Sequence, residues 1–443
     1  MADSAAPDPA THPQFAPRPD SASLDAAKMF DLSGRVAIVT GGSRGIGLSI
    51  AHGFAAQGAK VVVASRKADA CDTAAAEITA AGGQAQAAPV HMGDLDSVNR
   101  LVDATLEHYG QIDILVNNAA NPLGVLLTTS IGLLLPAIIW VHVAAGTTDF
   151  TFGGILEGRI EGAAVGLLLV LFVFGIGKAA VMPMHRWLPA AMVAPTPVSA
   201  LLHAVAVVKA GVFTVMKVIV YIFGIDHLFA SPGSQWLIYA AAFTIIAASV
   251  VALRQQNLKR LLAYSTVAQL SYVVMATAIL KPLAEIGAAI HIVAHAFGKI
   301  TLFFAAGAIY TAARKTELHQ LSGIGRRMPI TMAAFTIGAF SMIGVPPTAG
   351  FVSKWYILAG AFEADNTIAL FTIVASTALN AAYFLPIIYM AWFGAERQAP
   401  SPPHGEAPWP SVLALSLTAA LTIAFFLFNA PVLELERQIV TGP

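Results

Sequence analysis

Three ionisable residues recur at a spacing of four in one apolar stretch of the chain. His291, His295 and Lys299 fall in residues 285–312, and an ionised side chain near the centre of a bilayer costs at least about 2.5–3.5 kcal/mol on insertion scales. At about 100° per residue the three span about 80° of a helix, so they share one face. Histidine changes charge near neutral pH, and desolvation brings a lysine towards the same range. A buried row of such groups is what a proton relay needs.

Other lysines of the apolar half extend this set. Lys209 lies midway along residues 197–223, a stretch that also holds His203. Lys178 and Lys354 lie beside clusters of helix-breaking Pro and Gly. Broken membrane helices are tolerated where they line a polar cavity. Two broken segments, each with a lysine, indicate two related repeats of one transporter fold.

Simpler interpretations stay open for single members. Lys217 and Lys178 could extend their amines to the membrane surface, and His291 alone could be a packing residue. A metal held by His291 and His295 would need a third ligand, and no acid lies nearby in the sequence. No metal site is therefore expected.

A second kind of chemistry is indicated near the N-terminus. The apolar run Val36–Thr40 leads into Gly-Gly-Ser-Arg-Gly-Ile-Gly and then a helical pattern. Glycines let the backbone approach a pyrophosphate, and a helix N-terminus offers it free N–H groups. The second strand ends in Ser65 and Arg66 where an acid would hold a ribose hydroxyl, which favours NADP over NAD. The alternative is that Arg44 and Arg66 are solvated loop residues.

Composition divides the chain in two. Of its 443 residues 57% are hydrophobic and 11% charged, and the mean hydropathy is +0.70. The chain has 25 basic residues (Lys and Arg) and 25 acidic ones (Asp and Glu). Residues 1–121 contain eight of the basic and 13 of the acidic residues, and residues 122–443 contain the other 17 basic and 12 acidic residues. This apolar composition excludes a purely soluble or disordered protein.

Net charge and cysteine content exclude further classes. Zero net charge without a basic tract argues against a nucleic-acid partner. A single cysteine, Cys71, excludes an internal disulfide and a cysteine-based metal site.

The first 122 residues are predicted to form a leader and a small α/β domain. Residues 1–27 are rich in Ala, Pro, Asp and Ser and predict a disordered leader. Residues 28–122 alternate strand and helix patterns, which predicts a parallel sheet of about four strands. The expected strands are Val36–Thr40, Lys60–Ala64, Ala87–Met92 and Ile112–Val116, with helices over 45–57, 69–81 and 95–109.

The second part, residues 123–432, predicts an all-α membrane bundle of about nine helices, with a tail at 433–443. The apolar stretches are 123–144, 162–182, 197–223, 235–253, 261–280, 285–312, 330–359, 366–393 and 409–431. Each approaches or exceeds the roughly 20 residues that cross a bilayer. Loops on the side of the α/β domain hold nine Lys or Arg, and those on the other side hold three. The positive-inside rule therefore predicts an inner-membrane protein with its N-terminal domain in the cytoplasm.

Residues 28–122 resemble the first half of a short-chain dehydrogenase/reductase. The resemblance lies in Thr40-Gly41-x-x-x-Gly45-x-Gly47, in Asp94, and in Asn117-Asn-Ala-Ala. It implies NADP(H) as cofactor, with Asp94 at the adenine. The family's catalytic Tyr with Lys four positions later is absent, because none of the nine tyrosines has that lysine. The expected cofactor-binding residues are Gly41, Ser43, Arg44, Gly45, Ile46, Gly47, Ser65, Arg66, Asp94, Asn117 and Ala119.

Residues 123–431 resemble the proton-pumping antiporter-like family of Mrp-type cation/proton antiporter subunits and membrane subunits of NADH:quinone oxidoreductase. The resemblance lies in Gly177-Lys178 through Pro189, Pro195-Thr-Pro197 through His203, Lys259-Arg260 through Thr266, His291-x-x-x-His295-x-x-x-Lys299, and Pro346-Pro347 through Lys354. It implies that Lys178 and Lys354 belong to the two broken helices, that Lys299 is central, and that the histidines connect them. About five preceding helices of the family, one carrying the Glu that pairs with Lys178, have no counterpart here.

These observations predict a membrane subunit of a proton- or cation-translocating complex, in contact with lipid and with other membrane subunits, fused to an incomplete NADP-binding domain. The alternatives are a membrane-anchored NADP-dependent reductase and a non-functional chimera or gene-model fusion. The expected relay residues are Lys178, His203, Lys209, His291, His295, Lys299 and Lys354.

Overall fold

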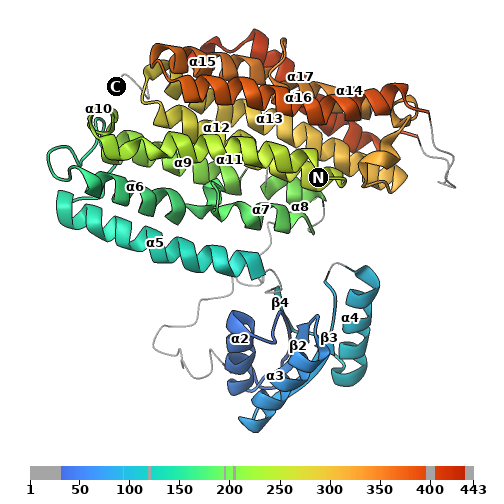
Figure 1. The fold of residues 1–443 in the computed structure, drawn as a ribbon. Helices are drawn as coiled ribbons and strands as arrows, with labels where there is room; N and C mark the ends of the chain where they lie inside the picture. Colours follow the sequence, from blue (N-terminus) through green and yellow to red (C-terminus); the bar gives the residue numbers. More distant parts are fainter. Residues whose placement is uncertain are drawn as a thin grey trace, which may run out of the picture. The chain divides into compact units, whose positions relative to one another are not determined.

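The structure is a computed structural model that describes residues 31–92, 94–117, 121–193, 196–202, 206–395 and 405–434. It divides into two compact units, Met1–Gly124 and Val125–Pro443. The first unit contains the described sheet and the second most of the helices (Figure 1).

The first unit is built on a parallel sheet in the order β3-β2-β1-β4. Its strands are β1 Val36–Thr40, β2 Lys60–Ser65, β3 Gln84–Pro89 and β4 Ile114–Asn117, and its helices are α2 Gly45–Ala56, α3 Ala68–Ala80 and α4 Leu95–Tyr109. This confirms the predicted four-stranded parallel sheet. The predicted bounds of the third strand were wrong, because β3 pairs with β2 from Gln84↔Lys60 to Pro89↔Ser65. Its first residues alternate Gln and Ala, so its apolar pattern begins late.

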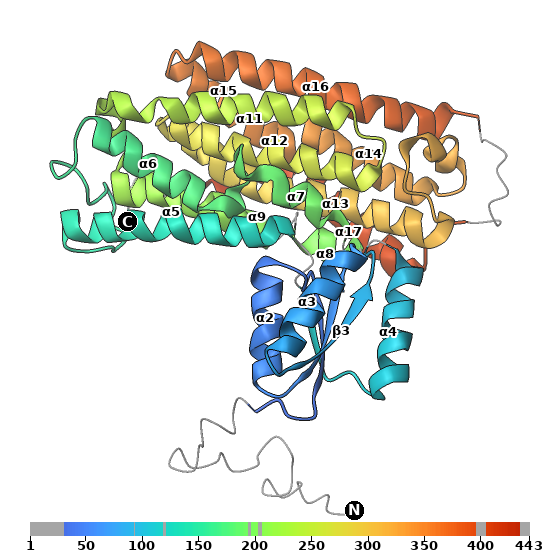
Figure 2. The same cartoon turned by 60° about the horizontal axis from the view of Figure 1, so that its bottom comes forward.

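Helices cover both faces of this sheet (Figure 2). Side chains alternate along each strand, so Val39 and Val61 pack with residues of α2 and α3, whereas Ile38 and Val62 pack with residues of α4. The strand β4 pairs with β1 alone among the described strands. Leu115 on β4 is 58% exposed, as expected for a strand at the edge of a sheet.

The second unit is a bundle of helices around α12 and α13. Its longer helices are α5 Asn121–Ala145, α6 Ala163–Gly175, α9 Val207–Val218, α11 Trp236–Leu253, α12 Leu258–Ala278, α13 Pro282–Ala313, α14 Pro329–Ile343, α15 Ala349–Glu363, α16 Thr367–Phe393 and α17 Trp409–Leu427. Helix α13 packs against α12, α14, α15 and α17. Helix α12 is buried along almost its whole length.

The predicted count of about nine membrane helices is not confirmed, whereas breaks are found near Lys178 and Lys354, where they were predicted. In the described residues five helices are long and apolar enough to cross a membrane, and Ser130–Ala145, α6 and α14 are shorter. The stretch 162–182 stops being α-helical at Gly175, and 330–359 is divided between α14 and α15. Gly344, with φ of +91°, ends α14, and the two prolines that follow cannot donate main-chain hydrogen bonds.

Short helices connect the longer ones where the chain breaks. After α6 come η4 Gly177–Ala179, η5 Met184–Arg186, α7 Trp187–Ala190 and η6 Ala191–Val193. The stretch 197–223 begins in α8 Thr196–Ala200, continues in α9 and ends in the π-turn Ile219–Phe223. Between α9 and α11 lie α10 Ile225–Ala230 and η9 Pro232–Ser234, and between α13 and α14 lie η10 Leu318–Leu321 and η11 Ile324–Arg326.

Candidate functional site

The row of ionisable residues on α13 lies inside the second unit. His291 and His295 are each 1% exposed, and Lys299 is 0% exposed. Gly298 lets α14 approach this helix, since a Cβ there would lie 2.5 Å from Cε of Met342. Close packing of α13 therefore places the row away from the lipid-facing surface of the unit.

Two other helices add groups to the histidine end of the row. The amine of Lys209 on α9 is in hydrogen-bond contact with Nδ1 of His295. The rings of His295 and His291 have centroids 6.1 Å apart. Nδ1 of His291 lies 2.9 Å from the hydroxyl of Ser353 on α15. A line of proton-carrying groups thus runs from α9 through α13 to α15.

Lys299 at the other end of the row is held by α12. Its amine donates to the hydroxyl of Ser265 at 2.7 Å and to the carbonyl of Leu262 at 3.1 Å. It also lies 5.9 Å from the ring centroid of Phe384. These partners are neutral, so they solvate the amine without fixing its charge.

Lys354 on α15 completes the end of α14. Pro346 and Pro347 stand where the main-chain donors to the carbonyls of Met342 and Ile343 would be, and proline has no N–H. The amine of Lys354 donates to both carbonyls at 2.9 Å. A cation is favourable at a helix C-terminus, where the dipole is negative. The proline pair therefore creates a site that a lysine amine fills.

Sequence reasoning missed the polar residues that link the two lysines. On α16, the hydroxyl of Tyr383 lies 2.9 Å from Oγ of Ser265 and contacts Oδ1 of Asn380. The amides of Asn380 and of Gln269 each donate to the carbonyl of Met342 at 3.3 Å. All of these side chains are buried. The sequence did contain one sign of this role, because Asn380 and Tyr383 are polar residues three positions apart in an otherwise apolar helix.

The remaining predicted relay residues are placed differently. The side chain of Lys178 is exposed, in the turn after α6, and His203 lies outside the described residues. Gly211 brings α9 against that turn, since a Cβ there would lie 2.4 Å from the main chain of Lys178 and Ala179. The structure therefore brings together Lys209, His291, His295, Lys299 and Lys354. Of Lys178 only the main chain lies near this group, at its contact with Gly211 of α9.

No carboxylate pairs with these lysines in the part of the chain that the structure describes. The two ion pairs found there, Arg35–Asp113 and Arg100–Asp94, both lie in the first unit. Glu285 near the start of α13 is 0% exposed, and neither of its oxygens has a hydrogen-bond partner. Among the described residues no group of three or more His, Cys, Asp or Glu could hold a metal ion.

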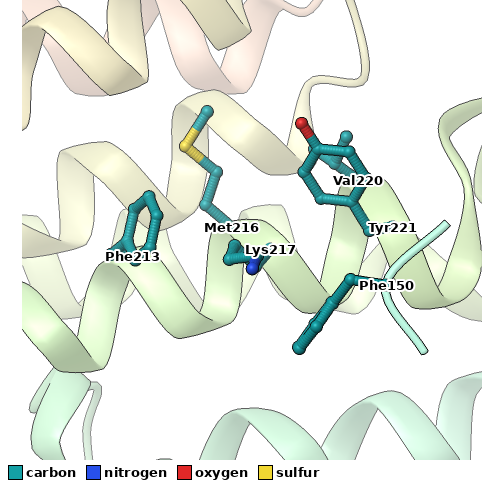
Figure 3. Close-up of a pocket in the computed structure, with 6 residues that line it drawn as sticks. All are labelled: Phe150, Phe213, Met216, Lys217, Val220 and Tyr221. Atoms are coloured by element: carbon teal, nitrogen blue, oxygen red, sulfur yellow. The ribbon is translucent and has the colours of Figure 1, made fainter. Parts of the chain in front are cut away.

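A cavity of about 320 Å³ lies apart from these groups, beside α9 (Figure 3). Its walls are Phe150, Phe213, Met216, Lys217, Val220 and Tyr221. The amine of Lys217 lies 4.1 Å from the ring centroid of Phe150. The lining is mostly hydrocarbon, and its polar groups are the amine of Lys217 and the hydroxyl of Tyr221, so these six residues offer a metal cation no carboxylate or imidazole.

In the first unit, the glycine-rich loop adopts the shape that a phosphate site needs. Gly41 and Gly45 have φ of +66° and +57°. A Cβ on Gly42 would lie 2.7 Å from the carbonyl of Val39. The loop follows β1 at the carboxyl edge of the sheet and opens α2, whose N-terminus has no side-chain cap. The N–H groups of the first turn of α2 are therefore available to an anion, whereas those of Gly41 and Gly42 donate to the carbonyl of Ala64.

The other predicted nucleotide contacts lie partly at the same edge. Ser65 ends β2 and is partly exposed, and Arg66 and Arg44 are exposed. Asp94 caps α4 by accepting a hydrogen bond from the N–H of Asp96 at 3.2 Å. Asn117 ends β4 opposite Thr40. Ser43 lies on the loop and Gly47 in the first turn of α2. The side chains of Ile46 and Asn117, and the whole of Ala119, lie outside the described residues.

Comparison with known proteins identifies the class to which this chain belongs. The family model described as NADH:quinone oxidoreductase/Mrp antiporter, TM, matches residues 110–380. The chain belongs to this membrane family, and it is a multi-pass membrane protein. A second family model, short chain dehydrogenase, matches residues 35–129. Both resemblances stated from the sequence are thereby confirmed.

Individual relatives agree with this assignment. The chain is 35% identical over 293 residues to NADH-quinone oxidoreductase subunit N of Desulforudis audaxviator, covering 63% of this chain and 58% of that protein. It is 31% identical to F(420)H(2) dehydrogenase subunit N of Methanosarcina mazei, covering 70% and 64%. A chain of the Mrp complex from Dietzia sp. has the same fold, with a TM-score of 0.63 at 22% identity over 72% of this chain and 67% of that one. The chain thus spans less than two thirds of these two curated relatives.

Proposed function

We propose that the chain is a membrane subunit of a proton- or cation-translocating complex of the Mrp antiporter or quinone oxidoreductase type. Its proposed relay consists of Lys178, His203, Lys209, His291, His295, Lys299 and Lys354. The observation that carries the proposal is the buried line of amines and imidazoles on α9, α13 and α15, with Lys209 in contact with His295. Ionisable groups inside a membrane are energetically costly, and where they occur they typically mark ion pathways and proton relays.

The setting of this subunit follows from the same reasoning. Relatives named as subunits of NADH-quinone oxidoreductase and of an Mrp complex support other membrane subunits and the lipid bilayer as partners. The excess of Lys and Arg in the loops on one side supports the inner membrane, with the first unit in the cytoplasm.

Proton flux through the reconstituted full chain tests this proposal. The chain is placed in vesicles containing a pH-sensitive dye, and an imposed potential drives protons inward. We expect flux above that of empty vesicles, reduced at least about tenfold by Lys299→Met. Lys217→Met is the matched control, because it removes a lysine outside the relay and should leave the flux unchanged. Equal flux in both variants would refute the role of Lys299.

A second activity, binding of NADP(H), is favoured by the glycine-rich loop. The positive φ of Gly41 and Gly45, and the lack of space for a Cβ at Gly42, fit a main chain that approaches a phosphate group. Arg66, directly after β2, and Arg44, directly before α2, are exposed and would hold a 2′-phosphate. We propose binding alone, because no tyrosine of the chain has the lysine at the fourth position that reduction in the resembled family requires.

A further inference from the structure

One carbonyl oxygen at the end of α14 has more donors than it can accept. The carbonyl of Met342 receives the amine of Lys354 at 2.9 Å and the amides of Gln269 and Asn380 at 3.3 Å. A carbonyl oxygen has two lone pairs, so three donors compete for two positions. Oε1 of Gln269 is buried without a hydrogen-bond partner. These hydrogen bonds can therefore be arranged in more than one way, as a switch requires.

The orientation of Asn380 depends on the hydroxyl of Tyr383. That hydroxyl has one proton and two neighbours, Oγ of Ser265 at 2.9 Å and Oδ1 of Asn380. When it donates to Asn380, the carbonyl oxygen of that amide is fixed and its NH2 group points to Met342. When it donates to Ser265, the amide of Asn380 is released. Tyr383 therefore selects between two hydrogen-bond arrangements.

The charge of Lys299 determines which arrangement is favoured. A protonated amine has no lone pair and can only donate to Ser265, so among the neighbours found in the described residues Tyr383 is the one left to accept the Ser265 proton. When Ser265 donates to Tyr383, the proton of Tyr383 is left for Asn380. A neutral Lys299 amine can accept from Ser265, and Tyr383 can then donate to Ser265 instead. When Lys299 is charged, the amide of Asn380 is thus oriented to donate to the carbonyl of Met342, to which Lys354 and Gln269 also donate.

We propose that Ser265, Tyr383 and Asn380 form a switch by which protonation of Lys299 loosens the hold of Lys354 on the end of α14. These three are positioning residues, and the inference rests on the proposed relay role of Lys299. It gives the relay a regulatory element, because the two lysines respond to each other across two further helices, α12 and α16. The switch needs no contact between the two amines.

Other ionisable groups surround Lys299 and have to be separated from it in any pH experiment. Helix α12 contributes Tyr272 and, in its first turns, Lys259, Arg260 and Tyr264; α15 contributes Lys354, α9 contributes Lys209, α16 contributes Tyr383, and α13 itself contributes His291 and His295. Helices α8, α14 and α17 contain no ionisable residue in their described ranges. A variant that lacks Lys299 but keeps all of the others provides the reference.

Hydrogen–deuterium exchange at the end of α14 tests the switch. The amides of Gly344 and Val345 both donate to the carbonyl of Phe340, so they report on opening of this helix end. Exchange of the full chain in lipid nanodiscs is measured over pH 5–10 and corrected for intrinsic rates. We expect exchange in the unaltered chain to rise about tenfold as Lys299 becomes protonated, and this step to be absent in Lys299→Met.

Two further variants test whether the effect of Lys299 on the end of α14 passes through the hydroxyl of Tyr383. Tyr383→Phe keeps Lys299 and the ring but removes the selecting hydroxyl, so it should lose the pH step. Ser249→Ala is the matched control for loss of a buried hydroxyl, because Ser249 bonds only to Ile245 of its own helix, and it should keep the step. An unchanged step in Tyr383→Phe, or no step in the unaltered chain, would overturn the switch.

Proton flux measured on the same preparations separates the two proposals. A pH step without flux would leave the switch standing and refute the proposed function. Flux without a step in the unaltered chain would support the function and refute the switch. Thermal unfolding of each variant verifies that the chain is folded before either measurement is interpreted.

Discussion

Lysine at position 299 offers a property that arginine, which stays charged, does not. Its amine can exist in a charged and a neutral form, and both forms can bond to the hydroxyl of Ser265 and the carbonyl of Leu262. Lys354 uses the same chemistry differently, because it replaces two main-chain donors that Pro346 and Pro347 lack. One amine is therefore suited to exchange a proton, and the other also supports a helix end.

Lys299→Arg tests whether exchange of the proton, rather than charge, is needed. A guanidinium remains protonated at any physiological pH, so we expect a reduction in proton flux of about tenfold or more, as for Lys299→Met. Flux in reconstituted vesicles is the measurement. A variant that retains more than half of the flux would show that a fixed charge is sufficient.

Asp113 in the first unit contributes a pH-dependent part of stability. The main-chain N–H of Val36 donates to its carboxylate at 2.8 Å, and this bond, with Arg35 and Gln111, lowers the pKa of Asp113. A lowered pKa in the folded state stabilises the unit above the unfolded value of about 3.9, and this contribution is lost as the pH falls through the lowered pKa.

We therefore expect Asp113→Asn to open the first unit more readily at pH 7, with the difference disappearing as the pH falls below about 4. Cys71 is the only cysteine and is completely buried in this unit, so its reaction with a disulfide reagent reports opening in the full chain. Asp103→Asn, at an exposed position of α4, is the control. A pH-independent difference would contradict the assignment.

At the scale of elements, the helices on the two sides of a break are held together by close contacts between their backbones. Gly350 at the start of α15 lies directly against α14, where a Cβ would be 1.7 Å from the carbonyl of Ser341. Its N–H donates to Oγ of Ser341 at 3.2 Å, which adds a hydrogen bond to this contact. The two halves of this broken segment are thus in contact because no side chain separates them.

Gly350→Ala should accordingly destabilise the second unit by about 3 kcal/mol or more, because overpacking of main chain on main chain has no easy relaxation. Gly132→Ala is a matched change in α5, where no atom lies within 4 Å of the added carbon, and it should be neutral or stabilising by about 0.5–1 kcal/mol. Thermal unfolding in detergent measures both. Similar losses would mean that the contact at Ser341 is not the cause.

The same elements show what a sequence can predict. The bounds of α2 and α4, and the spacing of His291, His295 and Lys299, follow from local periodicity and were predictable. The break within 330–359 was predictable from the Pro and Gly residues before Lys354, although the helix count treated this apolar stretch as one helix. The role of Asn380 and Tyr383 was hidden, because it depends on contact with Ser265, 118 residues away from Tyr383.

At the scale of the whole molecule, two units with different interiors share one chain. The first has the strand order of half a dinucleotide-binding fold and a core of small apolar residues with Cys71. The second has helices with buried lysines and histidines. Burial raises the pKa of the Cys71 thiol, so it is unreactive while the first unit is closed.

Binding of a nucleotide to the first unit should therefore protect Cys71 in the full chain. A ligand at about 100 times its dissociation constant stabilises the folded state by about 2.7 kcal/mol, which slows labelling that requires opening about a hundredfold. We expect protection by NADPH at lower concentrations than by NADH, and loss of that preference in Arg66→Ala. Equal labelling with and without nucleotide would refute the binding site.

The buried helix α12 has a consequence for how the protein is made. Hydroxyls of Thr266, Ser271 and Thr277 bond to carbonyls of their own helix, so these three polar side chains of α12 need no partners on other helices. It is nevertheless the least apolar of the five long spans, and its sides are covered by protein. During synthesis such a segment partitions weakly into lipid by itself. Its stable insertion should depend on the arrival of α11 and α13 on either side, which makes this trio a unit of biogenesis.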